Sequence, residues 1–158
     1  MMRPIRTYVD TCVFGGAFDV EFAAASNRFF TMAKEGAFDL TVSAVVMLEL
    51  TDAPSQVIEL VTSMRERLIV LDATPEIYAL QQRYLDEGIL TPKWEDDALH
   101  VAMATVAACD VMVSWNFKHI VNFRKIHQYN QVNQAMGYQP IDIRTPEEVI
   151  DDDSQEDV

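Results

Sequence analysis

The stretch "DALHVAMATVAACDVMVSWN", residues 97–116, decides the fold that the sequence predicts. Residues 97–108 form an apolar run long enough for a helix, whereas "DVMVSW", residues 110–115, is short and apolar, as buried strands are. A helix that leads directly into a buried strand is half of a repeating strand–helix unit. Two polar residues, Ser114 and Asn116, stand where this strand ends.

The same alternation runs through the rest of the chain. Further strands are expected at residues 5–10, 38–43 and 68–72, with an edge strand at 139–144. Helices are expected at residues 20–36, 44–53, 55–67, 74–88 and 117–131, with a turn at Gly15 and Gly16 and a capped helix start at 145–150. Short apolar strands between helices predict an α/β fold: three α/β/α layers around a central, mostly parallel sheet of four to five strands.

The charge of the chain is unevenly distributed. From residue 147 to the end there are seven acids and no base, so 18 acids and 12 bases remain for the body, a net charge of −6 out of −13. We therefore expect a single domain over residues 1–146 and an acidic, disordered tail over 147–158. An acidic body repels nucleic acid, so any such function needs a local basic patch or a metal ion.

Cysteine usage and hydropathy bear on the compartment. Cys12 and Cys109 lie far apart and show no metal-ligand spacing, which favours a reduced protein. The first residues lack the apolar core of a signal peptide, and no apolar run is long enough to span a bilayer. We expect a cytoplasmic protein with no membrane association.

Acidic residues recur where successive strands end, which is where α/β sheets build their sites. Asp10 closes the first strand, Glu49 lies in an otherwise apolar stretch after the second, and Asp96 and Asp97 open the helix before the fourth. Each has a structural alternative: a turn, a solvent-facing side chain, or a helix cap. Carboxylates that converge need a cation, and oxygen ligands suit Mg²⁺ or Mn²⁺, which can activate water for phosphodiester hydrolysis.

Four motifs resemble those of a known family in their order and rough separation. They are "YVDTCVF", "TVSAVVMLEL", "DDALHVAMA" and "DVMVSWNFKHI", and they are similar to the motifs of PIN-domain proteins, especially the toxin nucleases of VapBC type. The resemblance implies that Asp10, Glu49 and Asp97 bind Mg²⁺ or Mn²⁺ for RNA cleavage. It also implies an antitoxin partner and a homodimer.

The resemblance assigns supporting residues as well, and it shows one departure. Thr11 matches the hydroxyl residue that often follows the first acid, and Ser114 matches the Ser or Thr after the fourth strand. Asn116 stands where many relatives have Asp, so it offers an oxygen but no charge to a second ion. Asp96 is the neighbouring acid that can supply the missing charge.

The segment "NFKHIVNFRKIHQ", residues 116–128, is basic and directly follows the expected site. Lys118 and His119 lie closest to the strand end, and we expect them to contact RNA phosphates. The alternative is an amphipathic surface helix in which Phe123 and its apolar neighbours face inward.

Other side chains near the acids have two interpretations. His100 shares a helix face with Asp97, so it either orients a water or phosphate or is a buried, hydrogen-bonded histidine. Trp94 and Trp115 either stack on bases or pack in the core. Cys12 has no basic neighbour in sequence, so thiolate catalysis is not expected.

The main hypothesis is therefore a metal-dependent endoribonuclease that acts as the toxin of a type II toxin–antitoxin pair. The alternative is a catalytically weak or inactive PIN-fold module that binds RNA or assembles with a partner, which Asn116 and the acidic surface favour. Two phosphotransfer folds fit less well. A haloacid-dehalogenase-like enzyme needs a second Asp where Cys12 stands, and a receiver domain needs paired acids after the first strand.

Overall fold

The computed structural model describes residues 3–150, which form one sheet of five parallel strands. The strands are β1 (Ile5–Val9), β2 (Phe38–Ser43), β3 (Leu68–Leu71), β4 (Val111–Val113) and β5 (Asp142–Arg144). Their order across the sheet is β3-β2-β1-β4-β5. All five lie at the predicted places, and the edge position of β5 is confirmed.

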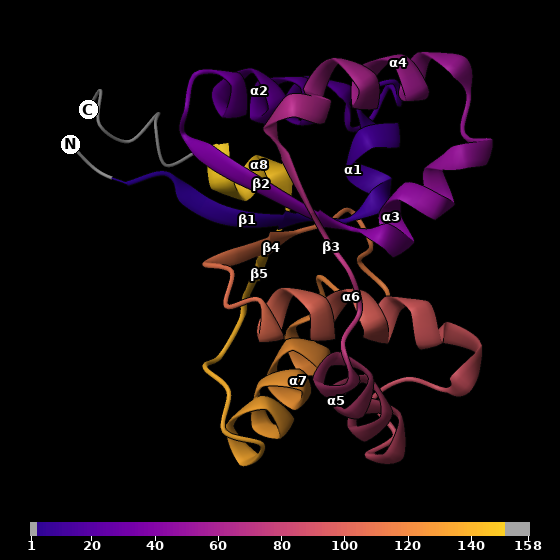
Figure 1. Ribbon diagram of the computed structural model, residues 1–158, viewed down its shortest axis with the longest axis vertical. Coiled ribbons are helices and arrows are strands. Elements are labelled where there is room, and N and C mark those ends of the chain that lie inside the picture. The colour runs from indigo at the N-terminus through magenta and orange to yellow at the C-terminus, as the bar shows by residue number, and fades with distance from the viewer. Residues whose placement is uncertain (1–2, 151–158) are drawn as a thin grey trace.

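Helices cover both faces of the sheet (Figure 1). The α-helices are α1 (Thr11–Gly16), α2 (Ala23–Lys34), α3 (Ala44–Glu49), α4 (Ser55–Met64), α5 (Pro75–Asp86), α6 (Glu95–Val106), α7 (Phe123–Ala135) and α8 (Pro146–Ile150). Short 3₁₀ turns, η1 (Leu50–Asp52), η2 (Arg65–Arg67) and η3 (Pro92–Trp94), extend or precede three of them. Helices α5, α6 and α7 lie on one face and the others on the opposite face, so the predicted three layers are confirmed.

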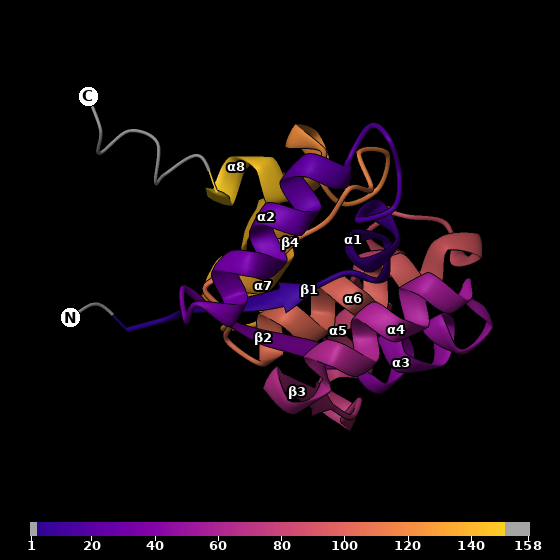
Figure 2. The same cartoon turned by 90° about the horizontal axis from the view of Figure 1, so that it is seen from above.

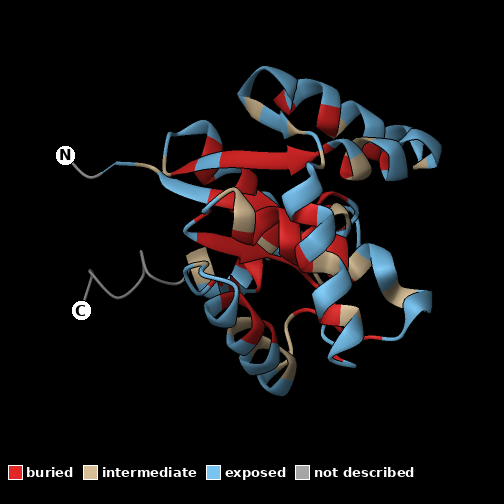
Figure 3. Ribbon diagram, turned by 60° about the horizontal axis from the view of Figure 1, so that its bottom comes forward, coloured by how far each residue is buried: buried red, intermediate tan, exposed pale blue. Residues whose placement is uncertain are grey.

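Burial follows from this layering. The interior strand β4 is buried throughout, and in the central strand β1 the last three residues are buried. The edge strand β3, by contrast, is partly exposed along its whole length. Figure 3 shows the buried residues concentrated in the sheet and on the inner sides of the helices, while the outer helix faces are exposed. This distribution is that of a sheet whose two faces are both covered. None of the helices in residues 3–150 is long and apolar enough to cross a membrane.

Local sequence signals set several helix ends. Thr74 caps α5 by accepting a hydrogen bond from the Ile77 amide at 3.4 Å, and Pro75 occupies the first helical position, as predicted. Gly36 and Gly88 follow α2 and α5 with φ of +93° and +75°, a conformation that glycine adopts without steric cost.

Two local predictions were wrong. The expected turn at Gly15 and Gly16 is the end of helix α1, which begins after its N-cap Asp10. A glycine is needed at position 16 because a Cβ there would lie 2.8 Å from both Ser26 Oγ and Trp115 Nε1. The second error is the helix expected from residue 117.

Helix α7 starts only at Phe123, because the side chain of Asn122 caps it by accepting a hydrogen bond from the Lys125 amide. Residues 117–122 instead form turns, and these carry Lys118 and His119. Phe123 was expected to face inward, but it is 78 % exposed. A capping side chain thus decides the start of this helix, and the apolar pattern does not.

The domain extends past its expected limit at residue 146. Helix α8 continues to Ile150 and lies against α2 (Figure 2). Val149 and Ile150 pack against the core, so the first part of the acidic segment belongs to the folded domain. The rest of the expected tail, 151–158, lies outside the described residues.

The strand order creates a natural place for a site. From β1 the chain moves outward to β2 and β3, and then crosses back to place β4 on the other side of β1. The place where the strand order reverses in this way is a topological switch point. There the connections leave the strand ends in opposite directions, and a crevice opens between them. Asp10 follows β1 and Ser114 follows β4, so both stand at this point.

Candidate functional site

Asp10 occupies the centre of the switch point and is 5 % exposed. Its Oδ1 accepts a hydrogen bond from the Thr11 amide at 2.8 Å, which is the cap of α1. Its Oδ2 accepts one from Ser114 Oγ at 2.7 Å, and the Asp10 amide itself bonds to the Val113 carbonyl. The ends of β1 and β4 are therefore joined through this carboxylate.

A buried histidine links Asp10 to Glu49, which ends α3. His100, on α6, donates from Nε2 to Glu49 Oε1 at 2.7 Å, and the same nitrogen lies 3.8 Å from Asp10 Oδ1. Its Nδ1 lies 2.7 Å from the Tyr8 hydroxyl, which in turn donates to Ser43 Oγ at 2.9 Å. Both ring nitrogens of His100 thus have partners, and the chain of bonds runs from β2 to the site.

This environment favours the charged form of His100. Burial opposes that charge, but the hydrogen bond to Glu49 and the charges of Asp10, Glu49 and Asp97 outweigh it and raise the pKa of His100 above its ordinary value of 6.5. An imidazolium between two carboxylates offsets their mutual repulsion. For Tyr8 burial acts in the other direction: it raises the pKa of the hydroxyl, which therefore stays protonated and available for hydrogen bonding.

The third predicted acid, Asp97, lies in the first turn of α6. Its Oδ2 accepts hydrogen bonds from His119 Nδ1 at 2.8 Å and from Asn116 Nδ2 at 3.2 Å. Asn116 accepts the His119 amide through Oδ1, which fixes the turn after β4. Asn116 and His119, which both follow β4, therefore hold Asp97 in place.

Ser114 connects the two acids across the sheet edge. It donates from Oγ to Asp10, and its Oγ accepts the Asn116 amide at 2.9 Å. Asn116 continues the chain to Asp97. An unbroken series of hydrogen bonds thus joins Asp10 to Asp97, so the sequence motifs that were matched separately form one structural unit.

A cleft of about 500 Å³ opens beside this unit. Its lining combines acids and an amide with basic side chains and an aromatic ring: Glu49, Asp96, Asp97, Asn116, Lys93, Lys118, His119 and Trp94. Asp10 and Ser114 are buried and are not among the residues that line the cleft, but hydrogen bonds through Ser114 and Asn116 connect Asp10 to Asp97, which does line it. We call the edge of the sheet that carries Asp10, Glu49 and Asp97 the acid edge. The cleft gives a polar ligand access to it through Glu49 and Asp97.

The side chains match a hard divalent cation in chemistry more than in arrangement. Carboxylates and an amide oxygen are the ligands that Mg²⁺ and Mn²⁺ prefer. Thr11 Oγ1 beside Asp10 is inaccessible to solvent and has no hydrogen-bond partner among the described residues. However, no three His, Cys, Asp or Glu side chains within residues 3–150 are grouped as metal ligands. They are not grouped because Glu49 is hydrogen-bonded to His100 and Asp97 to His119. The metal assignment therefore stays a prediction.

Three further predictions have mixed outcomes. Asp96 lines the cleft and is exposed, but it does not cap α6: the helix begins at Glu95 after the N-cap Trp94. Lys118 is exposed beside the acid edge, as a phosphate contact requires. His119 also lines the cleft, yet it is only 6 % exposed and its Nδ1 is bonded to Asp97. The RNA contacts of both stay predictions.

Sequence reasoning did not find the roles of Tyr8 and Ser43. Tyr8 is fully buried in β1, and Ser43 both caps α3 through the Val46 amide and accepts the tyrosine hydroxyl. The signal available in the sequence was a tyrosine in a buried strand, since a buried hydroxyl needs a partner. For His100, the structure supports the interpretation as a buried and hydrogen-bonded histidine.

Cys12 is next to the site but is not an activated thiol. The residue is exposed, while its Sγ is turned inward, accepts a hydrogen bond from the Trp115 amide and lies 3.4 Å from Asp10 Oδ2. Burial of the sulfur and the nearby Asp10 charge raise the pKa of the Cys12 thiol to about 12. The expectation that no thiolate acts here agrees with this shift.

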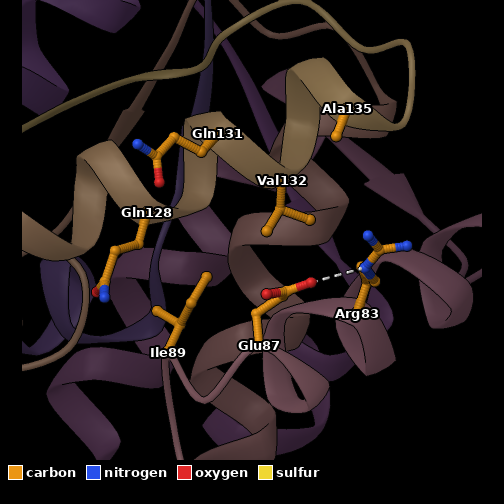
Figure 4. A pocket seen from close by; sticks show the side chains of 7 residues that line it. All are labelled: Arg83, Glu87, Ile89, Gln128, Gln131, Val132 and Ala135. Carbon is orange, nitrogen blue, oxygen red and sulfur yellow. Dashed lines mark hydrogen bonds and ion pairs between the residues drawn. The ribbon is translucent and has the colours of Figure 1, made fainter.

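A separate hollow lies between α5 and α7 (Figure 4). It is lined by Ile89, by Val132 and Ala135, by two glutamines and by an Arg83–Glu87 ion pair at 3.2 Å. None of the predicted site residues lines it. The acid edge of the sheet is therefore the better candidate for chemistry.

Comparisons with known proteins bear on the fold. No family model matches the chain, and no curated protein sequence matches it. Among solved structures, it is similar to a chain of "Crystal structure of VapBC2 from Rickettsia felis bound to a DNA fragment from their promoter". The TM-score is 0.57 at 14 % sequence identity, and the match covers 89 % of this chain and 98 % of that chain. The resemblance seen in the motifs is thereby confirmed at the level of architecture: the chain has the PIN-type α/β fold.

Proposed function

We propose that the protein is a divalent-metal-dependent endoribonuclease in which Asp10, Glu49 and Asp97 hold Mg²⁺ or Mn²⁺. The observation that carries the proposal is the hydrogen-bonded series from Asp10 through Ser114 and Asn116 to Asp97, at the switch point of the sheet. This series links two carboxylates from distant parts of the sequence, the buried Asp10 and Asp97, which lines an open cleft.

The residues around the acids have positioning roles in this proposal. Ser114 and the Thr11 amide fix the Asp10 carboxylate, Asn116 and His119 fix Asp97, and His100 fixes Glu49. The cation, when bound, would lower the pKa of a water molecule and offset the negative charge of the phosphate. Asn116 contributes an amide without charge, which favours one strongly held ion over two.

The electrostatics of the cleft suit an RNA backbone better than the net charge of the chain suggests. Lys93 and Lys118 lie at the cleft in a molecule whose body is acidic. They supply the local basic patch that a nucleic-acid ligand needs, and we assign them, with His119, to phosphate contacts. Long-range attraction would be weak, so binding depends on contacts within the cleft.

We further infer that the nuclease is a cytoplasmic toxin of a type II toxin–antitoxin pair, with an antitoxin protein as its partner and a homodimer as its assembly. Support comes from the four matching sequence motifs and from the similarity in fold to VapBC2. The second candidate is a catalytically inactive module of the same fold that binds RNA. Asn116, in place of an acid, is the observation that favours it.

The direct test is cleavage of single-stranded RNA by the purified protein with Mn²⁺, with Mg²⁺ or with EDTA. We expect cleavage with either metal, none with EDTA, and at least about a hundredfold loss in Asp10→Asn, because the amide keeps the helix cap but removes the charge that a cation needs. Asp39→Asn is the matched control, since Asp39 is an exposed aspartate of β2.

Unchanged cleavage by Asp10→Asn, or cleavage that persists in EDTA, would refute the metal-dependent mechanism. RNA binding without cleavage under every metal condition would favour the inactive module. Circular dichroism spectra of both variants establish that they are folded before their activities are compared.

A further inference from the structure

Trp94, which lines the cleft beside Asp97, lies between two lysines and a histidine. The ammonium groups of Lys93 and Lys118 lie 5.1 and 5.6 Å from the centre of the Trp94 ring. The His119 ring lies 4.5 Å from it at an angle of 45°. All four side chains line the cleft beside Asp97.

His119, on which the Trp94 ring packs, is held in place by its own hydrogen bonds. His119 is buried, its Nδ1 is bonded to Asp97, and its backbone carbonyl accepts a hydrogen bond from the Tyr129 hydroxyl at 2.7 Å. Trp94 itself is half-buried and packs partly against the core. The tryptophan ring is therefore held in place from within while part of it stays accessible.

The lysines, by contrast, are exposed and uncommitted to the nearby acids. Neither forms an ion pair within the described part of the chain, although Asp96 and Asp97 line the same cleft. Both ammonium groups lie near the aromatic ring instead. A contact of this kind at an exposed site is weaker than the stacking of a nucleic-acid base on an aromatic side chain.

We propose that Trp94 is a stacking platform for an unpaired base, and that Lys93 and Lys118 contact the phosphates on either side of it. The ligand class is single-stranded nucleic acid, because only an unpaired base offers its face to a ring at the rim of a cleft. A base that stacks on Trp94 displaces the two ammonium groups from the ring and frees them for phosphate oxygens. This inference rests on the proposed ribonuclease function and names the subsite that holds RNA beside the acid edge.

Binding can be tested without cleavage. The chain has two tryptophans, and Trp115 is buried against Phe22 and bonded to Ser26. In EDTA, an eight-nucleotide single-stranded RNA should quench the fluorescence of Trp94. Anisotropy of the labelled oligonucleotide gives the affinity, and a blunt duplex of the same sequence should bind much more weakly.

The variants separate stacking from charge. Trp94→Leu should lose the quenching and bind about tenfold or more weakly, while Trp94→Phe should keep most of the affinity because it retains an aromatic face. Lys93→Gln and Lys118→Gln should each reduce the salt dependence of binding. Tyr78→Leu is the matched control, since Tyr78 is an exposed aromatic residue of α5 that does not line the cleft.

Three results would overturn the proposal: no binding of the single strand by the unchanged protein, equal binding of the duplex, or an affinity of Trp94→Leu equal to that of the unchanged protein. Failure here is distinct from failure of the proposed function. A protein that cleaves RNA but binds it equally well without Trp94 refutes the stacking subsite alone. Binding that depends on Trp94 without any cleavage refutes the nuclease and leaves the subsite standing.

Discussion

The site contains two pairs of an acid and a histidine that look alike in chemistry and differ in their surroundings. Glu49 accepts a hydrogen bond from His100 at 2.7 Å, and Asp97 accepts one from His119 at 2.8 Å. In the inner pair, His100 is 1 % exposed, both of its ring nitrogens have partners, and Asp10 lies near it as a second carboxylate. In the outer pair, the ring lies against Trp94 at the cleft.

The difference indicates that the inner pair mainly stabilises the fold, whereas the outer pair lies where a ligand would bind. Both His100 and Asp10 are buried, and loss of the histidine would leave the buried Asp10 carboxylate without its partner, which is costly, so the inner pair should dominate stability. Solvent reaches the acid of both pairs, since the Glu49 side chain is 37 % exposed and the Asp97 side chain 21 % exposed. The outer pair differs because Asp97 also accepts a hydrogen bond from Asn116, and because His119 lines the cleft whereas His100 does not. Similar hydrogen-bond lengths therefore do not imply equal contributions to folding.

The largest expected effect comes from His100→Leu. The leucine fills the space of the ring, but the buried Asp10 carboxylate then lies near Glu49 without the imidazolium of His100 between them. The Tyr8 hydroxyl also loses a partner. We expect a loss of about 3 kcal/mol in the free energy of unfolding. Urea denaturation followed by circular dichroism measures it. A loss below about 1 kcal/mol would contradict the role of His100 in stabilising the buried Asp10 carboxylate.

The inner pair should also make stability depend on pH. The pKa of His100 is raised in the folded protein, so its stabilising effect is fully present below the unfolded value near 6.5 and is lost as the pH rises through the higher folded value. Denaturation of the unchanged protein and of His100→Gln over a pH series isolates this contribution. The stability difference between the two should shrink with rising pH, and a constant or growing difference would show that the pKa is not raised.

Tyr8→Phe should have an intermediate effect. It removes one hydroxyl and leaves His100 Nδ1 and Ser43 Oγ short of one partner in a buried site. The expected loss is about 1.5 kcal/mol, which thermal or urea unfolding can measure. Tyr78→Phe, which removes an exposed hydroxyl of α5, is the control and should change stability little. Equal losses in the two variants would show that the hydroxyl chain does not support His100.

The smallest change is expected for the outer pair. His119→Leu keeps apolar contact with Trp94 and frees a carboxylate that water can reach, so the expected loss is about 1 kcal/mol. Unfolding under the conditions used for His100→Leu gives the comparison directly. A loss equal to that of the inner variant would remove the distinction between the two pairs.

The sequence predicted the layers of the fold because strands and helices differ in local pattern, and because strand ends such as Asp10 and Ser114 follow directly from that pattern. It could not assign the partner of Glu49, since His100 lies 51 residues away and the contact exists only after α3 and α6 pack on the sheet. The helix start at Phe123 depended on which side chain caps it, and apolar periodicity does not reveal that. The orientation of Trp94 likewise depends on its contact with His119.

The most direct test of the proposed function is a crystal structure of the protein grown with Mn²⁺, in which anomalous scattering locates the ion. We predict an ion at the carboxyl edge of the sheet, bonded within about 2.5 Å to Asp10 and to at least one of Glu49 and Asp97. The anomalous signal should be absent from Asp10→Asn crystals. An ion bound elsewhere, or an acid edge that stays without one at millimolar Mn²⁺, would contradict the assignment of these carboxylates as metal ligands.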